Sequence, residues 1–144
     1  MRKKRGFTLI EVLIVIAIIS IIFAAMVVNI SGFQNEAKIS RAMGDLKTLQ
    51  LALEAYYKNY MYEFPPEENY QRTLIEAVPR VLEGNLIDPF GKDNSSLYLY
   101  KLSLNGTYYV LYSPGISHLG NAKVDDRGTV GLSWGPVWVS NGHL

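Results

Sequence analysis

Residues 4–28 read KRGFTLIEVLIVIAIISIIFAAMVV, and this apolar stretch decides the class of the fold. Within it, residues 12–28 are interrupted by one polar side chain, Ser20, and the wider range 7–30 carries one charge, Glu11. A helix of about twenty mainly apolar residues is long enough to cross a bilayer. Each Val, Leu, Ile or Phe favours insertion by roughly 0.3 to 0.6 kcal/mol, whereas a carboxylate at mid-membrane opposes it by at most about 3 kcal/mol. We therefore predict one transmembrane helix despite Glu11.

The basic residues are concentrated at the start of the chain. Four of the fourteen precede the apolar stretch: Arg2, Lys3, Lys4 and Arg5. By the positive-inside rule they keep this end in the cytoplasm and place the residues after the helix outside. The remaining ten basic and thirteen acidic residues carry a formal charge of −3, without the basic face that nucleic-acid binding needs. Direct binding of nucleic acid is therefore not expected.

An ordinary secretory signal peptide is an alternative interpretation of the N-terminal segment. Such a signal has an apolar region of about 7 to 15 residues and an A-x-A-like cleavage site. Here the apolar region is longer, carries Glu11 near its start and is not followed by such a site. We therefore favour a helix that remains in the mature protein.

The segment Lys4-Arg5-Gly6-Phe7-Thr8-Leu9-Ile10-Glu11, followed by the apolar stretch, resembles the prepilin signature of type IV pilins and type II secretion pseudopilins. The resemblance implies that a membrane prepilin peptidase cuts between Gly6 and Phe7 and that the new amine of Phe7 is methylated. It also implies a subunit of the bacterial inner membrane, with its head in the periplasm, that forms a helical homopolymer. The implied partners are minor pseudopilins or pilins, an inner-membrane platform protein and an assembly ATPase.

Glu11 has a predicted role in assembly. After cleavage, the amine of Phe7 and the carboxylate of Glu11 are four residues apart on one helix face. Because an unpaired carboxylate is costly in lipid, a new subunit gains by placing Glu11 against the positive N-terminus of a neighbour already in the filament. The alternative is that Glu11 only extends to the cytoplasmic interface.

Two residues depart from the pattern of this family. Ser20 stands where pilins commonly have glycine, and Val28 stands where many have proline. Without that proline the sequence predicts no break in the helix, and it leaves open a local melting near Val28.

Beyond Asn29 the sequence becomes amphipathic, which predicts that the helix continues. Apolar residues recur every three or four positions, at Ile39, Met43, Leu46, Leu49, Leu53, Tyr56 and Tyr60. A helix from Phe7 to about Tyr60 would be about 80 Å long, with its second half carrying a head. Pro65-Pro66 is expected to end it.

The rest of the chain predicts a small antiparallel sheet. Leu97–Leu104 and Thr107–Tyr112 are rich in strand-forming residues, and Asn105-Gly106 between them is a strong hairpin signal. The other expected elements are a short helix at 73–78, a type I turn at 88–91, and edge strands at 128–132 and 136–139.

The predicted fold is thus α+β, a pilin fold with a long N-terminal helix packed on the sheet. Its expected segments are a leader (1–6), a transmembrane and polymerisation segment (7–30) and a globular head (31–144). Ten tyrosines are interpreted as packing between helix and sheet, with their hydroxyls at the wet edge.

The head is similar to that of the major pseudopilin of type II secretion. The resemblance rests on Ile87–Lys92, Tyr109–Gly115 and the acidic pair Asp125-Asp126, and the absence of cysteine also favours a pseudopilin. In that family calcium binds near the acidic pair, so Asp125 and Asp126 are the candidate ligands. The family's further acidic residue is replaced here by Ile116 and Ser117, which predicts a weakened calcium site or none.

The alternative is a type IV pilin, major or minor, serving adhesion, motility or DNA uptake. It is kept open because the chain runs eighteen residues past Asp126, further than the pseudopilin pattern.

No enzyme is predicted. Residues 131–135 match the nucleophile motif G-x-S-x-G, but that motif needs a following helix and then an acid and a histidine in order. Only nine residues follow Gly135, and none is acidic. The two histidines, His118 and His143, do not have metal-ligand spacing and are interpreted as loop residues.

Overall fold

The computed structural model describes residues 7–27, 30–93 and 95–143. Contacts divide the chain into two units, one reaching to Glu36 and one beginning at Ala37, and each is described by itself. The predicted leader and the question of melting near Val28 lie outside the described residues. The predicted segment boundaries at 6 and 30 stay predictions.

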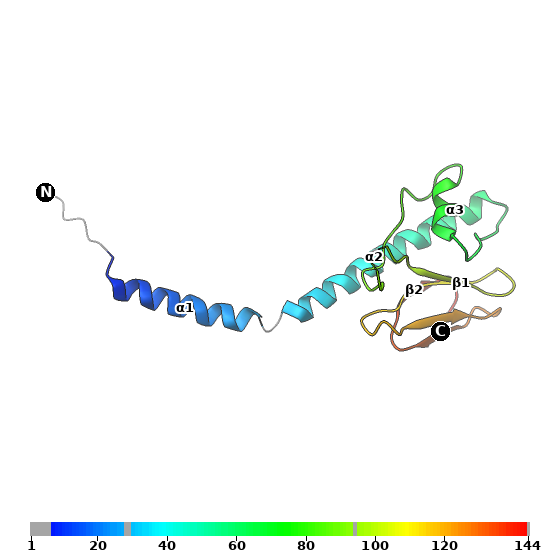
Figure 1. Cartoon of the computed structure of the whole chain (residues 1–144). Helices are drawn as coiled ribbons and strands as arrows, with labels where there is room; N and C mark the ends of the chain where they lie inside the picture. Colours follow the sequence, from blue (N-terminus) through cyan, green and yellow to red (C-terminus); the bar gives the residue numbers. More distant parts are fainter. Residues whose placement is uncertain (1–6, 28–29, 94, 144) are drawn as a thin grey trace. The chain divides into compact units, whose positions relative to one another are not determined.

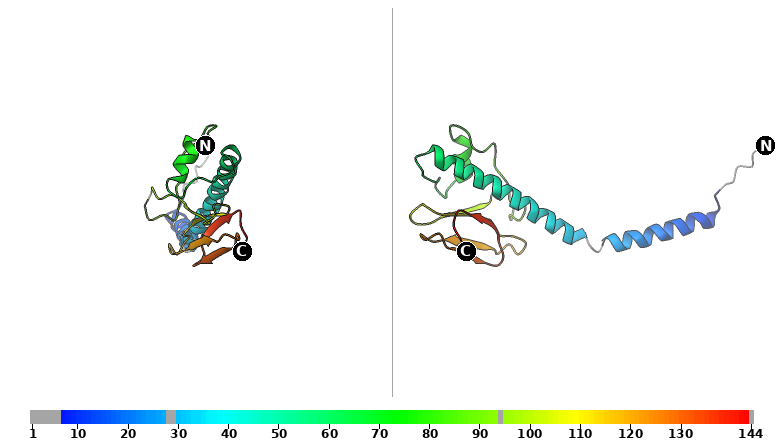
Figure 2. Two further views of the ribbon diagram at one scale, coloured as in Figure 1. Left: turned by 90° about the vertical axis from the view of Figure 1, so that its right-hand side faces the viewer. Right: turned by 180° about the vertical axis from the view of Figure 1, so that it is seen from behind.

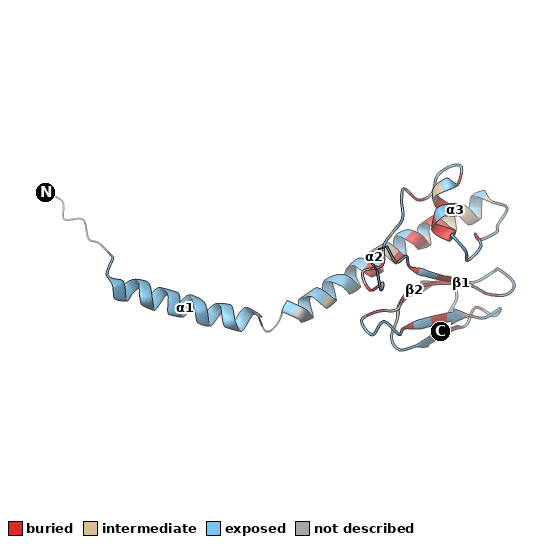
Figure 3. Cartoon of the chain, in the orientation of Figure 1, coloured by how far each residue is buried: buried red, intermediate tan, exposed pale blue. Residues whose placement is uncertain are grey.

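The first unit contains helix α1 (Leu9–Val27), in which no residue is buried. Its apolar side chains lie on every side, and Figure 3 shows the whole helix in the colour of exposed residues. It is the one helix among the described residues that is long and apolar enough to span a membrane. Its hydroxyl group is satisfied internally, because Ser20 Oγ donates to the Ile16 carbonyl at 2.7 Å. Such a helix must be covered by lipid or by other helices.

Helix α2 (Ile30–Asn59) provides one wall of the head core. Its fully buried positions, Ala42, Leu46, Leu49 and Leu53, are spaced by four, three and four and therefore share one face. The amphipathic stripe is confirmed except at Met43, which is exposed because the neighbouring Ala42 occupies the buried position.

The predicted end of this helix at about Tyr60 is confirmed, but Pro65-Pro66 is not what ends it. α2 ends at Asn59, and Met61 and Tyr62 follow with left-handed backbone at φ 53° and 63°. A residue in this conformation ends a helix without any proline.

The short helix α3 (Tyr70–Glu76) lies earlier than the predicted 73–78. Its first turn is anchored by buried polar side chains, a tertiary effect that the sequence pattern does not show. Tyr70 Oη donates to the Tyr98 carbonyl at 2.9 Å, and Gln71 bonds both the carbonyl and the N–H of Leu86 at 3.2 and 2.8 Å.

The strands form two antiparallel sheets. β1 (Leu99–Leu102), β2 (Tyr109–Ser113) and β5 (Val137–Ser140) make a sheet in the order β1-β2-β5, and β3 (Asn121–Val124) pairs with β4 (Val130–Ser133). The predicted hairpin is confirmed with shorter strands, in the register Leu102 opposite Tyr109. β4 and β5 confirm the two predicted edge strands approximately, and β3 was not predicted.

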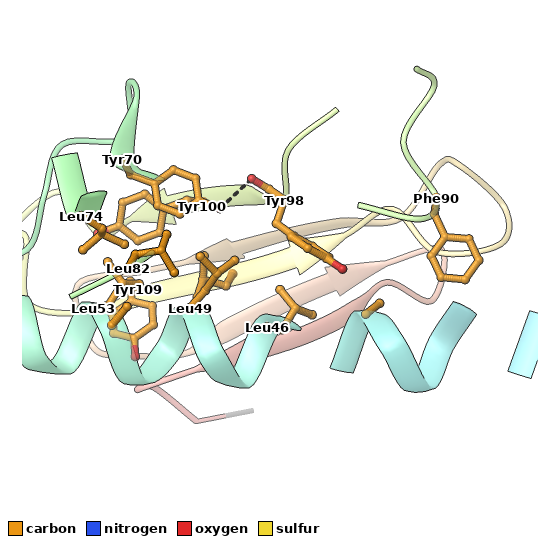
Figure 4. Packing of buried hydrophobic residues seen from close by; sticks show 13 residues of the cluster. Leu46, Leu49, Leu53, Tyr70, Leu74, Leu82, Phe90, Tyr98, Tyr100 and Tyr109 are labelled. Carbon is orange, nitrogen blue, oxygen red and sulfur yellow. Dashed lines mark hydrogen bonds between the residues drawn. The ribbon is translucent and has the colours of Figure 1, made fainter. Parts of the chain in front are cut away.

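The head has three layers, which the two views of Figure 2 show from the end and from behind. On one face of the central strand β2, Tyr109 and Leu111 join the cluster that covers α2; on the other, Val110 and Tyr112 pack on the β3-β4 sheet. Figure 4 shows the first cluster between the helix and the strands. Side chains alternate between the two faces of a strand, and both faces of β2 are covered, so all five residues of β2 are buried.

The buried tyrosines confirm the predicted packing role. Tyr98 Oη donates to Asp45 at 2.8 Å and Tyr109 Oη to Glu54 at 3.0 Å, both across the boundary between sheet and helix. Burial raises the pKa of both phenols above the ordinary value, and the neighbouring carboxylates add to the effect. The hydroxyls therefore remain donors at neutral pH.

Candidate functional site

The start of α1 places the predicted assembly residue. Thr8 directly precedes the helix, and both its N–H and its hydroxyl donate to Glu11 Oε2, at 2.8 and 2.9 Å. In return, the Glu11 N–H donates to Thr8 Oγ1 at 3.4 Å. This reciprocal arrangement is a capping box, in which the T-x-x-E pattern satisfies two free N–H groups at a helix start.

The capping box gives Glu11 a structural role beside its predicted role in assembly. The carboxylate lies at the positive end of the helix dipole, where a negative charge is stabilised. Phe7 is exposed just before the helix, next to Thr8. The capping role was not predicted, although the T-x-x-E pattern at Thr8 and Glu11 is a local sequence signal for it.

The predicted cleavage between Gly6 and Phe7 remains a prediction, since Gly6 lies outside the described residues. The methylation of Phe7 and the assembly role of Glu11 are predictions as well.

The candidate calcium residues lie in the turn between β3 and β4. Asp125 Oδ1 accepts the N–H groups of Arg127 and Thr129 at 2.9 and 2.8 Å. Asp126 Oδ1 accepts the N–H of Asn105 at 2.8 Å, which ties this turn to the tip of the β1-β2 hairpin. The Thr129 N–H in particular holds the pKa of Asp125 below its ordinary value.

The two carboxylates supply only part of the ligands that a calcium ion needs. Calcium takes six to eight oxygen ligands, and no group of three acidic or histidine side chains converges in the described part of the chain. The two carboxylates present already accept N–H groups of the protein. Their hydrogen bonds supply a way of holding the turn that uses no metal.

The remaining sequence motifs lie in strands and loops of the head. The G-x-S-x-G match lies on β4 and leads into strand β5 rather than into a helix. His118 Nδ1 lies 2.8 Å from the Phe90 carbonyl oxygen, and the N–H of His143 donates to the Gly128 carbonyl. Both histidines thus take part in loop contacts of the head.

Comparison with known proteins identifies the family of this chain. The family described as "Prokaryotic N-terminal methylation motif" matches residues 1–27. Type II secretion system core protein G of Escherichia coli (strain K12) is 31% identical over 116 residues, which cover 78% of this chain and 74% of that protein. This chain belongs to the core protein G family, the major pseudopilins of type II secretion.

A second core protein G, from Pseudomonas aeruginosa, is 32% identical over 117 residues, covering 79% of this chain and 77% of that protein. A different relative is the type IV major pilin protein PilA of Myxococcus xanthus, 44% identical over 55 residues. That match covers 38% of this chain and 25% of PilA, so the family of core protein G accounts for more of the molecule. No solved structure gives a significant match.

Proposed function

We propose that this chain is a structural subunit of a type II secretion pseudopilus, which polymerises through its N-terminal helix to drive protein export. The observation that carries the proposal is α1, a helix of nineteen residues with apolar side chains on all sides and none of them buried in its own chain. The long matches to two core proteins G support the same function.

The physical basis is that α1 exchanges lipid for sister helices without meeting water. Burial of each Val, Leu, Ile or Phe is worth about 1.5 to 3 kcal/mol, and α1 carries more than a dozen such side chains. Transfer of the helix into water would therefore cost tens of kcal/mol. Transfer into a bundle of identical helices keeps the same surface covered.

The location and processing follow from this proposal. The subunit is a single-pass protein of the bacterial inner membrane, with its N-terminus in the cytoplasm and its head in the periplasm. A prepilin peptidase removes residues 1–6, and the amine of Phe7 is methylated. A platform protein and an ATPase supply the work of assembly, and minor pseudopilins complete the filament.

Mass spectrometry of the purified chain tests the processing step. We expect a chain that begins at Phe7 and carries one added methyl group. A chain that still begins before Phe7 would contradict a filament role.

Glu11 in this proposal pairs with the N-terminal amine of a neighbouring subunit. The capping box makes a sharp test possible, because glutamine at this position keeps the cap but has no charge. We expect both Glu11→Gln and Glu11→Ala to enter the membrane and to be cleaved, and neither to form filaments visible by electron microscopy. Normal filaments from Glu11→Gln would show that the cap, and not the charge, is what assembly needs.

Ser20→Ala is the matched control for these variants. It removes the other polar side chain within α1, whose hydroxyl is already bonded to its own helix. We expect it to assemble normally. Loss of filaments in this variant too would mean that any polar change in α1 blocks assembly, and the pairing role of Glu11 would lose its support.

The type IV pilin remains the second candidate function, favoured by the match to PilA. Two assays separate these functions. Electron microscopy at native expression should show long surface fibres for a pilin. An export assay should show that folded proteins are no longer secreted when a pseudopilin is deleted.

A further inference from the structure

The head has an exposed apolar patch at each of its two ends. The tip patch comprises Met61, Tyr62 and Leu104, whose side chains are 91%, 70% and 99% exposed. The base patch comprises Ile116, Leu119 and Trp134, at 50%, 64% and 74%. Neither set belongs to the core clusters of the head.

The tip patch is formed by two segments that meet where α2 ends. Met61 and Tyr62 follow the last turn of α2, and Leu104 lies in the β1-β2 hairpin loop. A cavity of about 300 Å³ lies between these two segments, lined by Tyr62 and its neighbours on one side and by residues 105–107 of the hairpin on the other. Met61 and Leu104 do not line it, but each directly precedes a lining residue in the sequence. The patch is therefore one surface rather than scattered residues.

The base patch is likewise formed by two loops in close contact. Ser117 Oγ, between Ile116 and Leu119, donates to the Trp134 carbonyl at 3.2 Å. The loops approach so closely that a Cβ on Gly115 would lie 3.0 Å from the Gly135 carbonyl oxygen. The two loops are thus held together by this hydrogen bond and by their close approach, while their apolar side chains are exposed.

The two patches lie at opposite ends of the head. β2 starts near the tip, where Tyr109 bonds Glu54, and ends at Ser113, whose hydroxyl donates to Asp88 at 2.8 Å. The loop that follows β2 carries the base patch. Figure 1 shows this loop at the end of the head opposite the hairpin tip and the end of α2. The stretch of α2 within the head, from Ala37 to Asn59, is about 33 Å long.

Backbone strain is concentrated in the same loops. Met61, Tyr62 and Trp134 have φ values of 53°, 63° and 62°, in the left-handed region that costs roughly 1 kcal/mol or more for a residue with a Cβ. Their exposed side chains gain little from the core in return. Strain of this kind persists at functional positions when the surrounding structure enforces it.

We infer that the tip patch of one copy binds the base patch of another, so that heads stack end to end along the filament. This inference rests on the proposed function as a filament subunit. Two different patches on one chain form a heterologous contact, which repeats without closing into a ring when the rotation permits. A lipid surface or an unrelated protein would need only one patch, whereas a repeating contact needs both.

The size of the patches explains why the contact belongs to the filament. Together they expose roughly 900 Å², with each large side chain contributing about 100 to 200 Å². A stable interface in solution buries about 1,200 to 2,000 Å². The stack is therefore too small to hold two free heads together. It forms when the N-terminal helices have already brought the heads to a high effective concentration.

Cysteine cross-linking tests the contact, since the natural chain has no cysteine. We expect Met61→Cys combined with Trp134→Cys, in the full chain, to give a ladder of disulfide-linked multimers when assembled filaments are oxidised. Each single variant lacks one partner and should give no ladder, and the pair dispersed in detergent should give about tenfold less product than the filaments.

The control pair combines Met61→Cys with Lys123→Cys, an exposed position on β3 outside the base patch. A ladder of equal yield from this pair, or filaments of the first pair that give no ladder, would overturn the stacking contact and leave the proposed function intact. Absence of filaments from the unmodified chain would instead overturn the proposed function.

A charge exchange and a fluorescence measurement complete the test. Met61→Lys and Trp134→Glu should each lower the filament yield about tenfold, and the two together should restore it. The chain has two tryptophans, so Trp138→Phe leaves Trp134 as the only one. Quenching of Trp134 by brominated lipid in the assembled state would assign the base patch to the membrane and overturn the contact between copies.

Discussion

A pair of leucines on α2 tests the layer arrangement of the head. Leu49 is 0% exposed and faces the tyrosines of the sheet, whereas Leu51, two residues on, is 72% exposed. The substitution Leu→Ala at a fully buried site removes apolar contacts and leaves a cavity, at a cost of about 3 to 5 kcal/mol. The same substitution at an exposed helix position changes stability by about 0.5 kcal/mol or less. Leu51→Ala is therefore the matched control for Leu49→Ala.

The expected difference is large in thermal unfolding. For a head of about 100 residues, 1 kcal/mol shifts Tm by roughly 4 to 8 °C, so Leu49→Ala should lower Tm by at least about 12 °C. The assay is near-UV circular dichroism of the full processed chain in detergent, which reports on the packed tyrosines. Equal shifts for the two variants, or a shift for Leu49→Ala as small as that of the control, would refute the packing of this face of α2 against the sheet.

Three further predictions concern titration and metal. Burial raises the pKa of Glu67, but the Lys101 ammonium at 2.6 Å and the Leu102 N–H lower it more, so its folded pKa lies below the unfolded value. The stabilisation from this carboxylate is present above about pH 4 and is lost as pH falls through the folded pKa. Glu67→Gln should therefore flatten the decline in Tm between about pH 5 and pH 2. Burial raises the pKa of Tyr98 and Tyr109, so their stabilisation is present below about pH 10 and is lost at higher pH. Part of the rise in absorbance at 295 nm should therefore appear only together with the loss of near-UV circular dichroism, and complete ionisation of the tyrosines with native circular dichroism would contradict this. Calcium and EDTA should both leave the Tm of the head unchanged. Asp125→Asn should lower Tm equally in either condition, because it weakens the hydrogen bonds from the Arg127 and Thr129 N–H groups. A rise of Tm with calcium would instead show a metal site.

Local sequence signals were enough for several elements. α1 followed from uninterrupted apolar sequence, and the β1-β2 hairpin followed from Asn105-Gly106 between two strand-like runs. The capping box is equally local, because Thr8 and Glu11 are three residues apart, so the sequence alone could have predicted it.

Other features depend on tertiary packing and could not be predicted. Strand β3 shows two apolar residues in four, and Ala122 is buried only because the strand packs on the outer face of β2. The end of α2 is set by the left-handed backbone of Met61 and Tyr62, and no proline or glycine at these positions signals it in the sequence. The two end patches require the folded head, since Leu104 and Tyr62 are distant in sequence.

The pairing of β2 with β5 has a consequence for the order in which the head folds. β2 is synthesised well before its second partner, and the β3-β4 hairpin comes between them. Until β5 arrives, β2 presents one open edge, and Tyr109 lacks its bonds to Ser140 and Asn141. An open strand edge invites pairing with another chain. A chain in which β5 has not yet docked is therefore at its most prone to pair with another chain, and docking of β5 removes that open edge.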